Sequence, residues 1–106
     1  HLFDISAAVQ DYVEPFGFGI VRDYVGHGIG RHMHEDPAIP NYRQRGRGPK
    51  LLKGMCLAIE PMVTAGTYEV KVLEDEWTAV TRDGKNAAHY ENTVYITDGE
   101  PEILTL

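Results

Sequence analysis

From Met55 onward, short apolar segments alternate with turn signals, and this spacing constrains the fold more than any other feature of the sequence. We expect strands over residues 55–63, 68–73, 77–81, 90–97 and 103–106. The turn signals between them are Ala65-Gly66, Glu74-Asp75-Glu76, Asp83-Gly84 and Asp98-Gly99. Connections this short join neighbouring antiparallel strands, so the sequence predicts a mostly antiparallel sheet.

The part of the chain before this region adds one helix. Apolar residues recur at helical spacing from Leu2 to Val13, and Pro15 then interrupts the pattern, which predicts a helix over residues 2–14. We also expect a strand over residues 18–25. One helix flanking an antiparallel sheet is an α+β architecture, and a chain of 106 residues fits one domain, 1–106.

Two glycine-rich or proline-rich segments interrupt this pattern. Gly26 to Gly30 contains alternate glycines, which predicts a tight turn with an exposed backbone. Residues 37–50 contain several prolines and glycines and form the longest segment expected to be irregular.

The composition excludes several classes of protein. Hydrophobic residues make up 42% and charged residues 25%, so the chain is neither disordered nor collagen-like. A formal charge of −6 argues against a dedicated nucleic-acid binder, and we expect no DNA partner. The longest apolar run, Met55 to Ile59, is far shorter than the ~20 residues that span a bilayer, so we expect no membrane partner.

Features of the chain's start and its single cysteine bear on its location. Cys56 cannot form an intramolecular disulfide, and residues 1–4 do not begin a signal peptide. The sequence also lacks an initiator Met, so we expect a processed chain or a piece of a longer protein. A cytoplasmic location is the default expectation.

The first motif that could carry out chemistry is the glycine-rich segment around His27. Its G-x-G-x-G pattern is not the dinucleotide fingerprint, and Ala38 stands where a zinc-protease helix needs its second histidine after His34. What remains is two histidines around a bend, with glycines that let the backbone of His27 approach its surroundings closely. The alternative is a pair of solvated loop histidines.

Two glutamates interrupt apolar strands. Glu60 follows Cys56 and Ala58 on one face of its predicted strand, and Glu91 shares the face of Thr93 in another. Each could be a solvated residue at the end of a strand. If they are buried together, they require a positive charge between them. With imidazoles nearby, a divalent Mn, Fe, Co or Zn ion fits, and a two-metal centre would support hydrolysis.

Other residues have ordinary structural explanations. Trp77 is typical of hairpin packing, although it could also line an apolar subsite. Cys56 is typical of a small buried residue. Half of the ten basic residues lie within residues 43–53, which is typical of a solvated loop. The more specific alternative is a patch that docks to RNA.

Taken together, these motifs resemble the type I (bacterial-type) methionine aminopeptidases. The resemblance covers nearly the whole chain, in the order Gly26-His27-Gly28-Ile29-Gly30-Arg31, His34-Glu35-Asp36-Pro37, Ile59-Glu60-Pro61-Met62 and Tyr90-Glu91-Asn92-Thr93. It implies the pita-bread (creatinase/aminopeptidase) fold, with this chain as the C-terminal half. It also implies metal-dependent removal of the N-terminal methionine from nascent polypeptides with a small second residue, and association with the ribosome.

The resemblance assigns roles to individual residues. His27 and Glu60 would bind one metal ion, and Glu91 would bridge both ions of the pair. Glu60 would also act as the acid and base for the attacking water. His34 would contact the substrate and stabilise the tetrahedral intermediate. Trp77 and Met33 would line the pocket for the methionine side chain.

The resemblance also implies what this chain lacks. The family has two further aspartate ligands and another active-site histidine on strands that precede the segment matching the helix at residues 2–14. Asp4, Asp11 and Asp23 do not match that motif, so we expect the 106-residue chain alone to be inactive. Asn92 stands where many relatives carry His, which we interpret as tolerated variation.

Two alternatives remain within the same fold. Prolidase-like and X-Pro-cleaving enzymes share the glycine–histidine block but continue Glu-Pro-Gly, whereas this chain has Met62 after Pro61. A non-catalytic pita-bread binding module usually loses its metal ligands, and all three expected here are present.

Overall fold

The single α-helix, α1 (Leu2–Val13), forms where the apolar spacing predicts it. The structure is a computed structural model that describes all of residues 1–106. A 3-10 turn over Glu14–Phe16 carries Pro15, and Gly17 follows in the left-handed conformation with φ of 83°. Because glycine adopts positive φ without steric cost, Pro15 and Gly17 together end the helix and redirect the chain.

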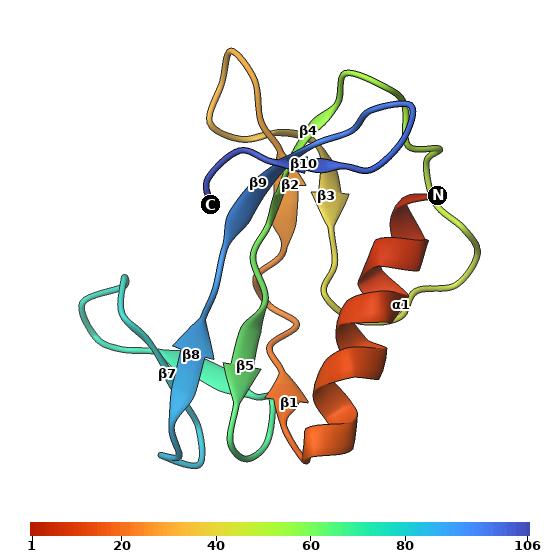
Figure 1. The fold of residues 1–106 in the computed structure, drawn as a ribbon. Coiled ribbons are helices and arrows are strands. Elements are labelled where there is room, and N and C mark those ends of the chain that lie inside the picture. Colours follow the sequence, from red (N-terminus) through yellow and green to blue (C-terminus); the bar gives the residue numbers. More distant parts are fainter.

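Ten short strands form three sheets, and every pairing between them is antiparallel, as the hairpin spacing predicts (Figure 1). The strands are β1 (Gly19–Ile20), β2 (Gly26–Gly28), β3 (Glu35–Ile39), β4 (Cys56–Ile59), β5 (Met62–Thr64), β6 (Val70–Val72), β7 (Ala79–Thr81), β8 (Ala87–His89), β9 (Asn92–Tyr95) and β10 (Glu102–Ile103). Their orders are β1-β5-β8, β10-β9-β4-β2-β3 and β6-β7.

The two larger sheets are joined by chain segments that pass from one to the other. β4 continues into β5, β8 continues into β9, and residues 21–25 link β1 to β2 (Figure 1). The strand predicted over residues 55–63 is therefore divided into β4 and β5, and the strand predicted over residues 90–97 is shortened to β9. A proline has no N–H for a ladder, so Pro61 helps to separate β4 from β5.

Gly26–Gly28 form a strand, so the prediction of a tight turn over Gly26 to Gly30 is wrong for these three residues, and the chain bends only from Gly30. β2 lies between β3 and β4, so neighbouring backbones crowd it from both sides. A Cβ atom added to Gly26 would collide with the carbonyl oxygen of Ala58, and one added to Gly28 would collide with that of Asp36. Glycine is required here by the close packing of three strands.

The neighbouring expectations also need correction. The strand predicted over 18–25 is limited to the two residues of β1, because the chain then leaves the ladder to reach β2. The segment predicted to be irregular, 37–50, begins within β3, which pairs with β2 despite Pro37 because β3 is the edge strand of its sheet.

The core lies between α1 and the five-stranded sheet. Leu2 from the helix, Ile39 from β3 and Leu57 from β4 are each at most 1% exposed and form one cluster. This burial fixes the helix against β3 and β4, the two strands that flank the glycine-rich strand β2. No helix is both long and apolar enough to cross a bilayer.

Candidate metal centre

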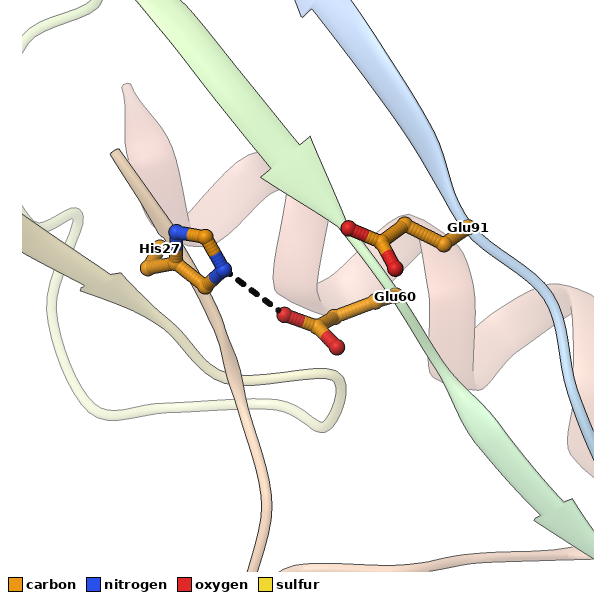
Figure 2. A group of neighbouring side chains, drawn as sticks. All are labelled: His27, Glu60 and Glu91. Carbon is orange, nitrogen blue, oxygen red and sulfur yellow. Dashed lines mark ion pairs between the residues drawn. The ribbon is translucent and has the colours of Figure 1, made fainter. Parts of the chain in front are cut away.

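The three predicted metal ligands converge from three separate segments of the chain. His27 lies on β2, Glu60 follows β4, and Glu91 precedes β9. Their ligand atoms all lie within 4.8 Å of one another, and the side chains point toward one another in Figure 2. Nε2 of His27 is 3.1 Å from Oε1 of Glu60. The structure thus brings the three residues together, and their role as metal ligands stays a prediction.

Strand register explains the convergence. Ala58 pairs with His27 across β2 and β4, so Glu60, two residues further on, is the diagonal neighbour of that histidine. On the other side of the same strand, Ile59 pairs with Asn92. Continuing this antiparallel register by one residue places Glu60 opposite Glu91. The side chains therefore meet because their strands are hydrogen-bonded in this register.

The donor set fits a divalent cation. The side chains of His27 and Glu60 are only 14% and 17% exposed, and that of Glu91 is 41% exposed. Like charges directly opposite on a sheet destabilise it, and a cation between the glutamates removes that cost. Ligand atoms at 2.0–2.2 Å from one ion lie roughly 3–4 Å apart, which suits a cluster of this size.

The hydrogen bond on the far side of the imidazole also suits a metal ligand. Nδ1 of His27 lies 2.8 Å from the carbonyl oxygen of Gly28, and it can only donate to that acceptor. With the proton on Nδ1, Nε2 presents a lone pair to Glu60. A second proton or a metal ion on Nε2 satisfies this contact, and metal-binding histidines are commonly oriented by such a bond to a backbone carbonyl.

His34 lies beside His27. The two ring centroids are 4.3 Å apart and the rings are tilted by 53°. The pairing of β2 with β3 shifts after His27, so that Gly28 pairs with Glu35. His34, the residue before Glu35, therefore lies beside His27. An exposed imidazole next to the cluster is available to a substrate, and its role stays a prediction.

The two residues predicted to line a methionine pocket are exposed. Met33 is 71% and Trp77 is 87% exposed, and neither belongs to the ligand cluster. Trp77 lies between β6 and β7 in a turn stabilised by Asp75, whose Oδ1 accepts hydrogen bonds from the N–H groups of Trp77 and Thr78. A bond from the Thr78 hydroxyl and these backbone bonds lower the pKa of Asp75. The pocket roles stay predictions.

Sequence reasoning missed one residue beside the cluster, His89 at the end of β8. Its Nε2 lies 3.3 Å from Oε2 of Glu60 and 3.9 Å from Oε2 of Glu91. Strand alternation gives a usable signal, because residues two apart share a face and His89 precedes Glu91 by two. His89 also lines a cavity of about 710 Å³, together with Met62, Tyr24 and other residues of mixed polarity.

The chain matches the family model described as metallopeptidase family M24 over residues 1–98. It is 68% identical to the methionine aminopeptidase of Clostridium acetobutylicum over 99% of its length, and 56% identical to methionine aminopeptidase 1 of Bacillus subtilis over 98%. In both cases it covers 42% of the relative, so the chain spans about two fifths of the length of these proteins.

Solved structures give the same result for the fold. The chain superposes on the methionine aminopeptidase of Thermotoga maritima with a TM-score of 0.94 at 58% identity, covering 98% of this chain and 42% of that one. For the enzyme from Rickettsia prowazekii the TM-score is also 0.94, at 44% identity, covering 99% and 43%. The expected α+β pita-bread architecture is confirmed.

Proposed function

The chain belongs to metallopeptidase family M24, and from this premise we propose that it forms part of an enzyme that removes the N-terminal methionine from nascent polypeptides. The names of its relatives support this activity, at identities up to 68%. The observation that carries the proposal is the convergence of His27, Glu60 and Glu91 within 4.8 Å. The proposed substrate has a small second residue and is made in the cytoplasm, which is therefore the proposed location.

The proposed metal complement is a pair of divalent ions, with Co, Mn, Fe and Zn as candidates because the ligands are mixed imidazole and carboxylate. His27 and Glu60 would hold one ion and Glu91 would bridge the pair. Such ions supply Lewis acidity toward the peptide carbonyl and lower the pKa of water. The family relationship supports metal dependence, and the burial of His27 and Glu60 favours strong binding.

The chain's own side chains would handle the proton and the substrate. Glu60 would accept a proton from the attacking water and return it to the leaving amine. His34, with its ring 4.3 Å from that of His27, would donate a hydrogen bond to the peptide oxygen as negative charge develops. Trp77 and Met33 would contact the methionine side chain of the substrate.

A chimera tests this function. Residues 1–106 would replace the matching segment of the C. acetobutylicum enzyme, which is 68% identical there. We expect this chimera, with Mn²⁺ or Co²⁺, to release methionine from Met-Ala-Ser, and the 106-residue chain alone to be inactive because it offers three ligands to a pair of ions. A folded, metal-bound chimera that cleaves only an X-Pro peptide would favour the prolidase-like alternative, and one that cleaves neither would favour a binding module.

Residues 43–53 would contribute to association with the ribosome. Arg43 is bound to Asp11 through both carboxylate oxygens, and Lys53 is paired with Asp98. The remaining basic residues of the segment, Arg45, Arg47 and Lys50, are exposed and form no ion pair. Co-sedimentation of the chimera with ribosomes, lost when these three become alanine, would support this; unchanged co-sedimentation would contradict it.

A further inference from the structure

We propose that His89 is a positioning residue that holds the Glu60 carboxylate by one oxygen and so directs the other toward His27 and the metal ion. The inference rests on the proposed metal centre and adds to it a residue with no role so far. It concerns the geometry of a ligand and does not make His89 a ligand.

The two oxygens of Glu60 face different histidines. Oε1 lies 3.1 Å from Nε2 of His27, and Oε2 lies 3.3 Å from Nε2 of His89. A carboxylate that accepts a hydrogen bond at one oxygen loses the freedom to rotate about its last bond. The N–H of His89 therefore selects the orientation in which Oε1 is presented to the ligand cluster.

The backbone holds His89 in the right place for this contact. Met62 pairs with His89 across β5 and β8, and the N–H of Tyr90 donates to the carbonyl of Pro61 over 3.2 Å. Glu60 is two residues before Met62, so it is the diagonal neighbour of His89. The same diagonal relationship connects Glu60 to His27 on its other side, where Ala58 is the paired residue.

The position of His89 outside the ligand cluster favours a positioning role over metal binding. The side chains whose ligand atoms all lie within 4.8 Å of one another are His27, Glu60 and Glu91, and His89 is not among them. The side chain of His89 is 42% exposed, compared with 14% for His27. His89 thus lies on the solvent side of Glu60. Partners of this kind fix the direction and basicity of the ligand, and their loss typically costs about 10- to 100-fold in metal affinity or activity.

The role predicts a specific pattern among variants. The His89→Leu variant loses the imidazole N–H donor but keeps a side chain of similar size. In His89→Gln, an amide N–H can replace this donor. His32→Leu is the matched control, because His32 is an exposed histidine whose side chain makes no hydrogen bond. Each variant would be made in the chimera described above, and circular dichroism would report folding. Should His89→Leu fail to fold, His89→Ala serves the same comparison.

The readouts are Mn²⁺ affinity by calorimetry, the visible spectrum of the Co²⁺ form, and kcat and KM separately. We expect His89→Leu to lower Mn²⁺ affinity about 10- to 100-fold and to shift the Co²⁺ spectrum. We expect His89→Gln and His32→Leu to stay within about threefold of the parent. The spectrum matters because a merely structural role would leave the Co²⁺ environment unchanged.

The outcomes separate this inference from the proposed function. A parent chimera that binds no metal contradicts both. If the parent binds metal and cleaves Met-Ala-Ser while His89→Leu matches it in affinity and spectrum, the function stands and the inference is overturned. It is also overturned if His89→Gln is as impaired as His89→Leu, since the imidazole would then be needed as a ligand.

Discussion

Glu60 and Glu91 lie opposite each other in the two segments that connect the five-stranded sheet to the three-stranded sheet. The pairs Ile59–Asn92 and Met62–His89 belong to different sheets, yet they follow one uninterrupted register. The positions between them therefore also face each other, although neither glutamate belongs to a strand. A cation between these two carboxylates would relieve their repulsion, and His27 lies close enough to be a third ligand.

Glu91→Ala removes the proposed bridging ligand. In the chimera we expect loss of the metal pair and of methionine release, because His27 and Glu60 cannot hold two ions. Metal analysis by mass spectrometry and the Met-Ala-Ser assay would measure this, with Glu100→Ala in an exposed turn as the control. Full occupancy by two ions in Glu91→Ala would refute the bridging role.

Gly28→Ala tests the close packing of β2. The added methyl group would meet the Asp36 backbone, so we expect a loss of about 1–3 kcal/mol in the free energy of unfolding. Gly99→Ala is the matched control, since its Cβ meets nothing within 4 Å and its φ is not positive. Urea unfolding of both variants would measure the difference. Equal stability of the two would show that β2 can move away from β3.

Asp83 gives the fold a dependence on pH. Its carboxylate accepts hydrogen bonds from the N–H groups of Lys85 and Thr67, and these bonds lower its pKa in the folded chain. A lowered folded pKa means that the stabilisation is complete above the unfolded value of about 3.9 and is lost as pH falls through the folded value.

The matching variant is Asp83→Asn, in which the side chain no longer titrates. We expect its urea midpoint to fall less steeply than that of the parent below about pH 4. Asp23→Asn serves as the control for removal of an exposed carboxylate that forms no ion pair. Parallel pH profiles for Asp83→Asn and the parent would mean that ionisation of Asp83 contributes nothing to the pH dependence of folding.

Trp77→Ala separates substrate binding from metal binding. Because this side chain is 87% exposed, its removal should leave metal content and folding unchanged. A lost aromatic–thioether contact is expected to raise KM for Met-Ala-Ser about two- to tenfold in the chimera. Tyr12→Ala, which removes another exposed aromatic residue on α1, is the comparison. A KM unchanged from the parent would remove Trp77 from the pocket.

Local patterns were sufficient to predict the helix and to single out the two glutamates. The apolar spacing of residues 2–13 and the following Pro15 depend only on neighbours along the chain, so α1 was predictable to within a residue. Glu60 and Glu91 could be recognised because a carboxylate inside an apolar strand is unusual, and the family motif joined them to His27. The structure then supplied the shared register that brings them together.

Features that depend on distant neighbours were not predictable in this way. Gly26 and Gly28 have poor strand propensity, and they form β2 because this segment pairs with β3 on one side and β4 on the other, where a side chain has no room. Pro61 marks the interruption between β4 and β5, but the passage of the chain from one sheet to the other depends on partner strands that are distant in the sequence. The contact of His89 depends on Glu60, which lies 29 residues earlier in the chain, between β4 and β5.

The most direct test of the metal centre is anomalous diffraction from crystals of the chimera grown with Mn²⁺. We predict an ion within about 2.3 Å of Nε2 of His27 and of a carboxylate oxygen of Glu60, with Glu91 as a shared ligand of a second ion. Strong anomalous density elsewhere, with none between His27, Glu60 and Glu91, would contradict the account.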